Sequence, residues 1–212
     1  LMVTPLPLAT ALTAVATDNV GATTTSSSVA VTVTGPVNVA LAANGATAVA
    51  SSSYGSNFGP SGAINGDRKG LQWGAGGGWA DGTANTFPDW LEVDFNGPKT
   101  INEVHVFTVQ DAYAAPSAPT PTMTFSLYGV TAFQVQYWDG TQWLTVPGGT
   151  ISGNTLVWRQ IAFSELTTSK IRVRVTGALG GYSRLAEVEA YQAAPPGTTP
   201  PRAPTPPIRP TR

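Results

Sequence analysis

Short runs of residues alternate apolar and polar side chains, and no stretch of ten residues has the periodicity of an amphipathic helix. In residues 171–175 Ile and Val alternate with Arg, and comparable runs occupy residues 91–95 and 133–138. Successive side chains of a β-strand point to opposite faces, so this period is typical of strands. Turns rich in glycine and proline follow the runs, at residues 96–98, 139–140 and 147–149. The pattern predicts an all-β protein, an antiparallel β-sandwich or jelly roll.

Composition divides the chain into three zones. Residues 1–36 are rich in Ala, Thr, Ser and Val, whereas residues 37–192 hold all six Trp, all six Tyr and the single His. Residues 193–212 contain eight prolines, so we expect an extended tail of polyproline type that has no core of its own. We therefore predict a jelly roll over residues 37–192, an N-terminal hairpin with a linker before it, and a proline-rich C-terminal tail after it.

The first zone contains two candidate strands, residues 12–17 and 29–34, with a turn at residues 18–21. They resemble the last two strands of a bacterial immunoglobulin-like module. An isolated two-stranded hairpin is marginally stable in water. We therefore expect either that further strands lie upstream in a longer precursor or that another surface covers this hairpin.

Composition also excludes several classes of function. Only 11% of the residues are charged and the formal net charge is -1, so the chain lacks the basic excess that nucleic-acid binding needs. The absence of Cys excludes disulfides, zinc-thiolate sites and cysteine nucleophiles, and a single His argues against a multi-histidine metal centre. No apolar run is long enough to span a membrane. Residue 1 is Leu, without a following signal-peptide pattern, so we expect a mature or trimmed product.

Four stretches, in order along residues 37–192, resemble the discoidin family, also called the coagulation factor V/VIII C-type domain. They are NVALAANGATAVASSSY, GAINGDRKG, PDWLEVDF and SKIRVRVTGALGGYSRLAEVEAY. The bacterial members of this family include many carbohydrate-binding modules. The resemblance implies an antiparallel jelly roll whose two ends lie close together. It also implies loops at one end of the barrel that bind glycans, lipid headgroups or proteins, and it implies no catalysis.

The same resemblance suggests a calcium site. Calcium takes roughly six to eight oxygen ligands, and the turn from Asn65 to Asp67 can direct several oxygens to one point. In the family this loop pairs with a Glu that follows an Ala near the last strand, and the matching residues here are Ala186 and Glu187. This chain departs from the family in having Asn65 where Asp is common, and in a longer loop. The alternative is an ordinary turn beside an exposed Glu187.

Aromatic loops are the candidates for ligand binding. In the segment LQWGAGGGWADG, Trp79 is a candidate for stacking on a sugar ring and Asp81 for accepting bonds from sugar hydroxyls. The alternative is that Trp79 packs within the protein, which is the interpretation we favour for Trp73. The loop of residues 110–124 is long for a hairpin connection, and Tyr113 is its one aromatic residue. Long loops are often functional.

A third candidate loop, residues 180–184, contains Tyr182 and Arg184. Arg184 has the geometry to bind a glycan or a carboxylate through two hydrogen bonds. It could instead pair with Glu187, and we favour that simpler interpretation. No nucleophile motif or phosphate-binding loop is present, so we predict that the chain is not an enzyme.

These observations predict a non-catalytic, extracellular binding module that a bacterium secretes or carries on its cell surface. Its ligand would be a glycan or another cell-surface polymer, held by aromatic stacking and hydrogen bonds from loops on a rigid sandwich. The alternative is a structural subunit of an extracellular filament or surface assembly. Strand addition by the N-terminal hairpin would then cause self-association, and the proline-rich tail would lie along the next subunit.

Overall fold

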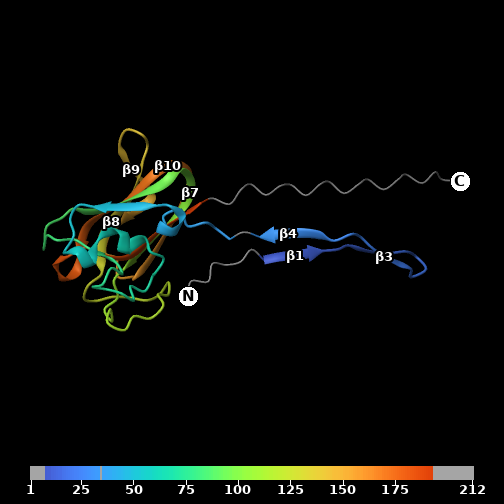
Figure 1. Cartoon of the computed structure of the whole chain (residues 1–212), viewed down its shortest axis with the longest axis horizontal. Coiled ribbons are helices and arrows are strands. Elements are labelled where there is room, and N and C mark those ends of the chain that lie inside the picture. The colour runs from blue at the N-terminus through green and yellow to red at the C-terminus, as the bar shows by residue number, and fades with distance from the viewer. Residues whose placement is uncertain (1–7, 34, 193–212) are drawn as a thin grey trace.

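The computed structural model describes residues 8–33 and 35–192, and residues 35–192 form a β-sandwich (Figure 1). The strand order is β6-β11-β7-β10-β8-β9, with β5 also paired to β7, and every pairing is antiparallel. The predicted all-β, antiparallel jelly-roll class is confirmed. The strands are β5 (Thr47–Ala50), β6 (Trp79–Ala80), β7 (Asp89–Thr108), β8 (Val130–Trp138), β9 (Trp143–Ile151), β10 (Trp158–Ala178) and β11 (Arg184–Gln192).

The two longest strands, β7 and β10, pair with each other and belong to both layers. Their register shifts between residues 162 and 166 of β10, and again between residues 168 and 170. On one side of the shifts β7 pairs with β5 and β10 pairs with β8, whereas on the other side β7 pairs with β11. A register irregularity bends a strand, so β7 and β10 pass from one layer to the other.

The core lies between the two layers. Leu91 and Val93 come from one half of β7, Val104 and Val106 from the other half, and all four are buried in the same hydrophobic cluster. The arginines of residues 171–175 alternate with buried valines and stay partly exposed, as the period-two pattern predicts.

The two ends of the sandwich domain lie side by side, as expected. The backbone N–H of Val39 donates to the carbonyl of Ala190 at 2.8 Å, and that of Gln192 donates to the carbonyl of Val37 at 3.0 Å. In the described part of the chain, helices are limited to four short 3-10 segments, none of which could cross a membrane. They are η1 (Ala42–Asn44), η2 (Ser56–Phe58), η3 (Pro60–Ile64) and η4 (Leu179–Gly181).

The N-terminal hairpin forms, but as two short ladders rather than one. Strand β1 (Leu8–Leu12) pairs with β4 (Val29–Val33), and β2 (Val15–Thr17) pairs with β3 (Thr23–Thr25). The prediction of one strand over residues 12–17 is therefore wrong, because β1 ends at Leu12 and β2 covers only Val15–Thr17.

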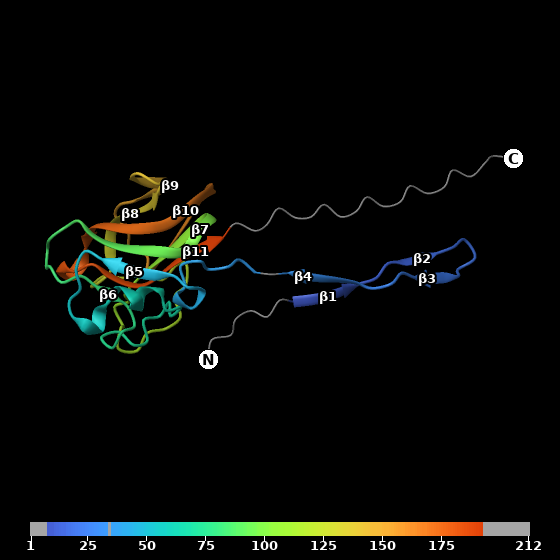
Figure 2. The same ribbon diagram turned by 45° about the horizontal axis from the view of Figure 1, so that its top comes forward.

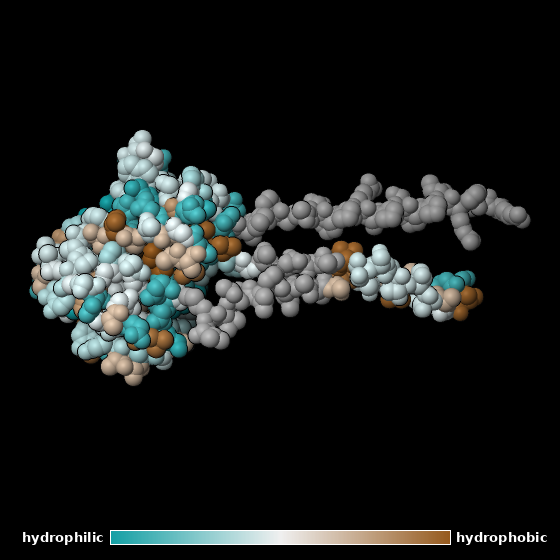
Figure 3. All heavy atoms as spheres, viewed as in Figure 1, coloured by the Kyte–Doolittle hydropathy of each residue, from teal (hydrophilic) through white to brown (hydrophobic). Residues whose placement is uncertain are grey.

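The hairpin leads away from the sandwich in both ribbon views (Figures 1 and 2). All side chains from residue 11 to residue 29 are exposed, and apolar ones appear on the surface in Figure 3. Its assignment to an immunoglobulin-like module stays a prediction, and the proline-rich tail lies outside the described residues.

Candidate functional site

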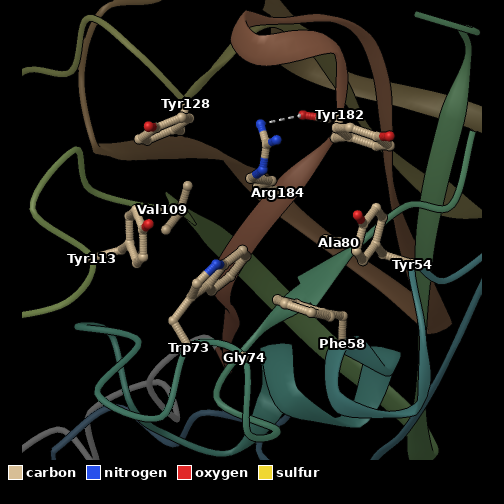
Figure 4. Close-up of a pocket in the computed structure, with 10 residues that line it drawn as sticks. All are labelled: Tyr54, Phe58, Trp73, Gly74, Ala80, Val109, Tyr113, Tyr128, Tyr182 and Arg184. Atoms are coloured by element: carbon tan, nitrogen blue, oxygen red, sulfur yellow. Dashed lines mark hydrogen bonds between the residues drawn. The ribbon is translucent and has the colours of Figure 1, made fainter. Parts of the chain in front are cut away.

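A cavity of about 340 Å³ opens at the end of the sandwich where β11 begins (Figure 4). The opposite end of β11 meets the start of the domain, so the cavity is far from the junction with the hairpin. The lining comes from the loop after β5, from the glycine-rich segment that leads into β6, from the loop between β7 and β8, and from the start of β11 with the loop before it. The lining residues are Tyr54, Phe58, Trp73, Gly74, Ala80, Val109, Tyr113, Tyr128, Tyr182 and Arg184.

Aromatic rings on one wall contact each other edge to face. The ring of Tyr54 lies 5.2 Å from that of Tyr182 and 5.6 Å from that of Phe58, which lies 5.6 Å from Trp73. Edge-to-face contacts of this kind fix the orientation of the rings relative to one another. Tyr54 is 59% exposed although it contacts two other rings, so this wall is open to solvent.

The second wall is a pair of tyrosines. Tyr113 and Tyr128 are 5.7 Å apart between ring centres, in an edge-to-face arrangement, and Tyr113 is 43% exposed. In Figure 4 this pair lies across the opening from Tyr54 and Tyr182, and Trp73 lies between Tyr113 and Phe58. A flat ligand that enters the cavity would therefore meet aromatic surface on both sides.

The position of Trp73 depends on a glycine. Gly78 has φ of +155°, and a Cβ atom there would come within 2.4 Å of the Trp73 ring and 2.9 Å of the Leu185 carbonyl oxygen. Any other residue would push the ring away. With glycine the indole packs against backbone and stays partly exposed at the cavity.

Arg184 stands between two tyrosine rings. Its guanidinium carbon lies 5.4 Å from the ring centre of Tyr128 and 5.2 Å from that of Tyr182. Nη1 donates to the carbonyl oxygens of Leu179 at 3.0 Å and Tyr182 at 3.3 Å, and Nη2 donates to that of Gly180 at 3.3 Å. Burial lowers the pKa of Arg184, since the charged form loses water. The guanidinium is therefore a partly desolvated cation in an aromatic cage.

In a comparison with models of protein families, the model described as F5/8 type C domain matches residues 47–188 of this chain. The chain belongs to this family. Among solved structures, a Streptococcus pneumoniae fucose binding module is 22% identical with a TM-score of 0.56, and the match covers 75% of this chain and 97% of that one. A comparison with curated protein sequences finds no match.

Two further neighbours among solved structures come from a chitosanase/glucanase of Paenibacillus sp. IK-5. Its chitosan-binding module 1 is 24% identical with a TM-score of 0.52, and covers 73% of this chain and 98% of its own. Its chitosan-binding module 2, solved with chitotriose, is 19% identical with a TM-score of 0.55, and covers 73% and 99%. These likenesses show the fold.

Three residues predicted at the site, Tyr113, Tyr182 and Arg184, do line the cavity, but the other two do not. Trp79 is 0% exposed and its Nε1 donates to the Ser52 carbonyl at 2.8 Å, so the prediction that it stacks on a ligand is wrong. It belongs to the hydrophobic core because it lies on β6, whose residues pair with β11.

Asp81 is also buried, and the prediction that it accepts bonds from a ligand is wrong. Its Oδ1 accepts from the backbone N–H of Ser183 at 2.6 Å, and its Oδ2 accepts from the N–H of Thr83 at 2.7 Å and from its hydroxyl. The carboxylate instead joins the start of β11 to the segment after β6.

Sequence reasoning missed other residues of the site. Trp73, interpreted as a packing residue, lines the cavity, and so do Tyr54, Phe58 and Tyr128. The favoured pairing of Arg184 with Glu187 is wrong as well, because Arg184 donates to backbone carbonyls of the adjacent loop. The aromatic residues after β5 and before β8 were a usable signal, since they fall in loops at the same end of the sandwich.

The predicted calcium ligands are not among the residues that line the cavity. Glu187 is 0% exposed; its Oε1 accepts from the N–H of Gly66 at 3.0 Å, while its Oε2 has no hydrogen-bond partner among the described residues. An exposed Glu187, the alternative expectation, is therefore wrong. Burial raises the pKa of Glu187 to about 8, with a smaller opposing effect from the Gly66 N–H. A buried carboxylate with an oxygen left free fits a bound cation.

The loop opposite Glu187 is tied by its own side chains. Asn65 Oδ1 accepts from the N–H of Asp67 at 2.7 Å, and the Asp67 carboxylate accepts from the N–H groups of Lys69 at 3.0 Å and Leu71 at 2.6 Å. No group of three or more His, Cys, Asp or Glu side chains in the described part of the chain could hold a metal. Backbone carbonyls and amide oxygens, which calcium accepts, would have to complete the shell.

The raised pKa of Glu187 predicts a pH-dependent stability in the presence of chelator. Below about pH 4.5 the carboxyl is protonated in both states, whereas from there to about pH 8 only the unfolded chain releases the proton. As pH rises through this range, the free energy of unfolding of the wild type should therefore fall relative to that of Glu187→Gln, by up to about 1.4 kcal/mol per pH unit. Urea denaturation of both proteins across this range measures the difference. Parallel pH profiles would contradict a buried, proton-retaining Glu187.

Proposed function

We propose that residues 37–192 form a non-catalytic carbohydrate-binding module whose aromatic cavity holds a sugar. The observation that carries the proposal is the cavity itself, in which six aromatic side chains surround one guanidinium. Its volume falls within the range of small-molecule sites, roughly 300–1,000 Å³. Aromatic faces bury the C–H surface of a sugar ring, while the tyrosine hydroxyls and the guanidinium offer hydrogen bonds.

The absence of acid and base groups supports a binding role. Among the ten lining residues there is no carboxylate and no imidazole, the groups that most often transfer protons in hydrolysis of glycosides. The neighbours named for binding fucose and chitosan are consistent with the same use of the fold here. Fold alone does not choose a ligand, so the proposal rests on the cavity. An extracellular or surface-attached location fits a module that binds polysaccharide.

Replacing Trp73 by Ala should weaken glycan binding while the fold survives. The indole is partly exposed at the cavity, so we expect at least a tenfold loss of affinity, about 1.4 kcal/mol, on a panel of neutral and acidic oligosaccharides. Trp143→Ala is the matched control, because Trp143 is similarly half-buried but lies on β9, outside the cavity. Binding by isothermal titration and melting temperature are both measured. If wild type binds no member of the panel, or Trp143→Ala weakens binding equally, the proposal fails.

We also propose that a calcium ion binds beside Glu187. The free Oε2 of Glu187 and the Asn65–Asp67 loop would hold it, with the carbonyl of Ala186 as the remaining expected ligand. The ion would neutralise the buried carboxylate and tie the loop before β6 to β11. Its role would be structural, because these residues are not among those that line the cavity.

Calcium should raise the melting temperature of chelator-treated wild type and leave Glu187→Gln unchanged. A ligand that binds only the folded state stabilises it by about 2.7 kcal/mol at a hundredfold excess over Kd. Glu187→Gln keeps the shape of the side chain and removes its charge, and magnesium serves as the control cation. Differential scanning calorimetry measures the shift. An identical shift in both proteins would show that calcium acts elsewhere.

A second candidate function, self-association, is favoured by one observation. The hairpin of residues 8–33 exposes Leu12, Val15, Val20 and Val29, each more than half exposed. A two-stranded ribbon of this kind is marginal without a partner surface. Strand addition to the edge of a neighbouring copy would cover these side chains and would build a filament if the contact does not close.

Deleting residues 1–34 should leave a folded monomer that no longer assembles. All six Trp lie in the remaining sequence, so tryptophan fluorescence reports its folding directly. Light scattering on full-length and shortened chains at increasing concentration measures assembly. A full-length chain that remains monomeric throughout would exclude self-association through the hairpin.

A further inference from the structure

Arg184 has hydrogen-bonding capacity left over at the cavity. Its Nη1 is occupied by two backbone carbonyls and its Nη2 by one. A guanidinium also carries an N–H on Nε and a second N–H on Nη2. None of the described residues accepts a hydrogen bond from Nε, and Nη2 makes only the one bond. Nε and Nη2 lie along the same edge of the guanidinium, and each still has an N–H for which no described residue is an acceptor.

The corresponding edge of two other arginines is filled. Arg68 donates from Nε and Nη2 to the two carboxylate oxygens of Glu189, at 2.7 and 2.9 Å. Arg172 donates from the same two nitrogens to the amide oxygen of Gln136, at 3.0 and 2.7 Å. Where this sequence has an acceptor beside the edge, the arginine uses it, and the Arg68 pair shows how closely a carboxylate fits.

The charge of Arg184 is also uncompensated by an ion pair. No carboxylate of the described residues forms a salt bridge with it. Asp81 acts on it through space, but the oxygens of Asp81 accept bonds from Ser183 and Thr83. Because the cavity lining contains no acidic side chain, an anion that enters the cavity can contact one cation and no carboxylate.

We propose that the cavity selects an acidic sugar, a uronic acid or another sugar that carries a carboxylate. The sugar ring stacks between the aromatic walls, and its carboxylate accepts two hydrogen bonds from the Nε and Nη2 edge of Arg184. This inference rests on the proposed function and adds the substrate class. A planar carboxylate offers two oxygens at the spacing of this edge, whereas the hydroxymethyl group of a neutral sugar offers one.

The test compares matched ligands on unaltered full-length protein. Methyl galacturonide is set against methyl galactoside, and methyl glucuronide against methyl glucoside, by titration followed with NMR. Within a pair the ligands differ only in the carboxylate. We expect at least one acid to bind about tenfold or more tightly than its neutral partner, because a hydrogen bond to a charged group adds that much. A rising salt concentration should weaken binding of the acidic sugar and leave binding of the neutral sugar unchanged.

Arg184→Lys provides the test on the protein side. Lysine keeps the positive charge but lacks the two-donor edge, so the preference for the acid should fall to about threefold or less, within the range of a single weaker contact. Arg172→Lys, outside the cavity, is the control and should keep the full preference. Because Arg184 also binds the loop of residues 179–182, near-UV circular dichroism checks that the fold persists, and the wild-type comparison decides without any variant.

The outcomes separate the two proposals. Equal or tighter binding of the neutral sugars overturns the acidic preference and leaves a carbohydrate-binding module. Binding of neither member of either pair, together with no binding across the oligosaccharide panel, overturns both. A preference for the acid that survives in Arg184→Lys and disappears in Arg172→Lys would place the acidic site on the outer face of the sheet instead.

Discussion

The pairing of β7 with β10 is the contact on which the rest of the sandwich depends. It runs from Phe107 with Trp158 to Asp89 with Val175, and it is interrupted where the strands cross between layers. Every other strand of the domain joins one of these two strands or a strand paired to them. Since both layers share β7 and β10, the loops at each end are held at fixed separations. This arrangement also positions the cavity, because the lining residue Val109 directly follows β7.

A buried group of hydrogen-bonded polar side chains connects the strands to the cavity. Ser183 donates its N–H to Asp81 and its hydroxyl to Asp89 Oδ2 at 2.7 Å, so three segments meet at one residue. Burial raises the pKa of Asp89, but the serine hydroxyl and other donors oppose the shift. Buried polar groups are tolerated when they are bonded, and they then fix geometry. The neighbours of Ser183 in sequence, Tyr182 and Arg184, are therefore presented to the cavity from a rigid anchor.

The alternation of apolar and polar residues and the family resemblance predicted most of the fold. They predicted only part of the candidate site. Alternation predicted which residues of β7, β8 and β10 face the core, because burial of one face is a local property of a strand. Trp79 and Trp73 could not be distinguished that way, since both lie in a glycine-rich segment. Their difference depends on pairing of β6 with β11 and on contact between Gly78 and the Trp73 ring. The strand pairing joins residues far apart in sequence, and the contact with Gly78 depends on the course of the loop between the two residues, so neither is visible in a local pattern.

Two charged groups of β11 lie in opposite electrostatic situations. Arg184 is a partly buried cation without an ion-pair partner, and three residues later Glu187 is a buried carboxyl with an oxygen left free. A register shift between Leu185 and Glu187 interrupts the alternation of side chains along this strand. Arg184 lines the cavity, and Glu187 contacts the loop that contains Gly66. Burying a charge alone is costly, so we expect an anion to stabilise the charged form of Arg184 and a cation that of Glu187. Under the two proposals above, a single strand supplies an anion-binding group to the cavity and a cation-binding group to the loop that contains Gly66.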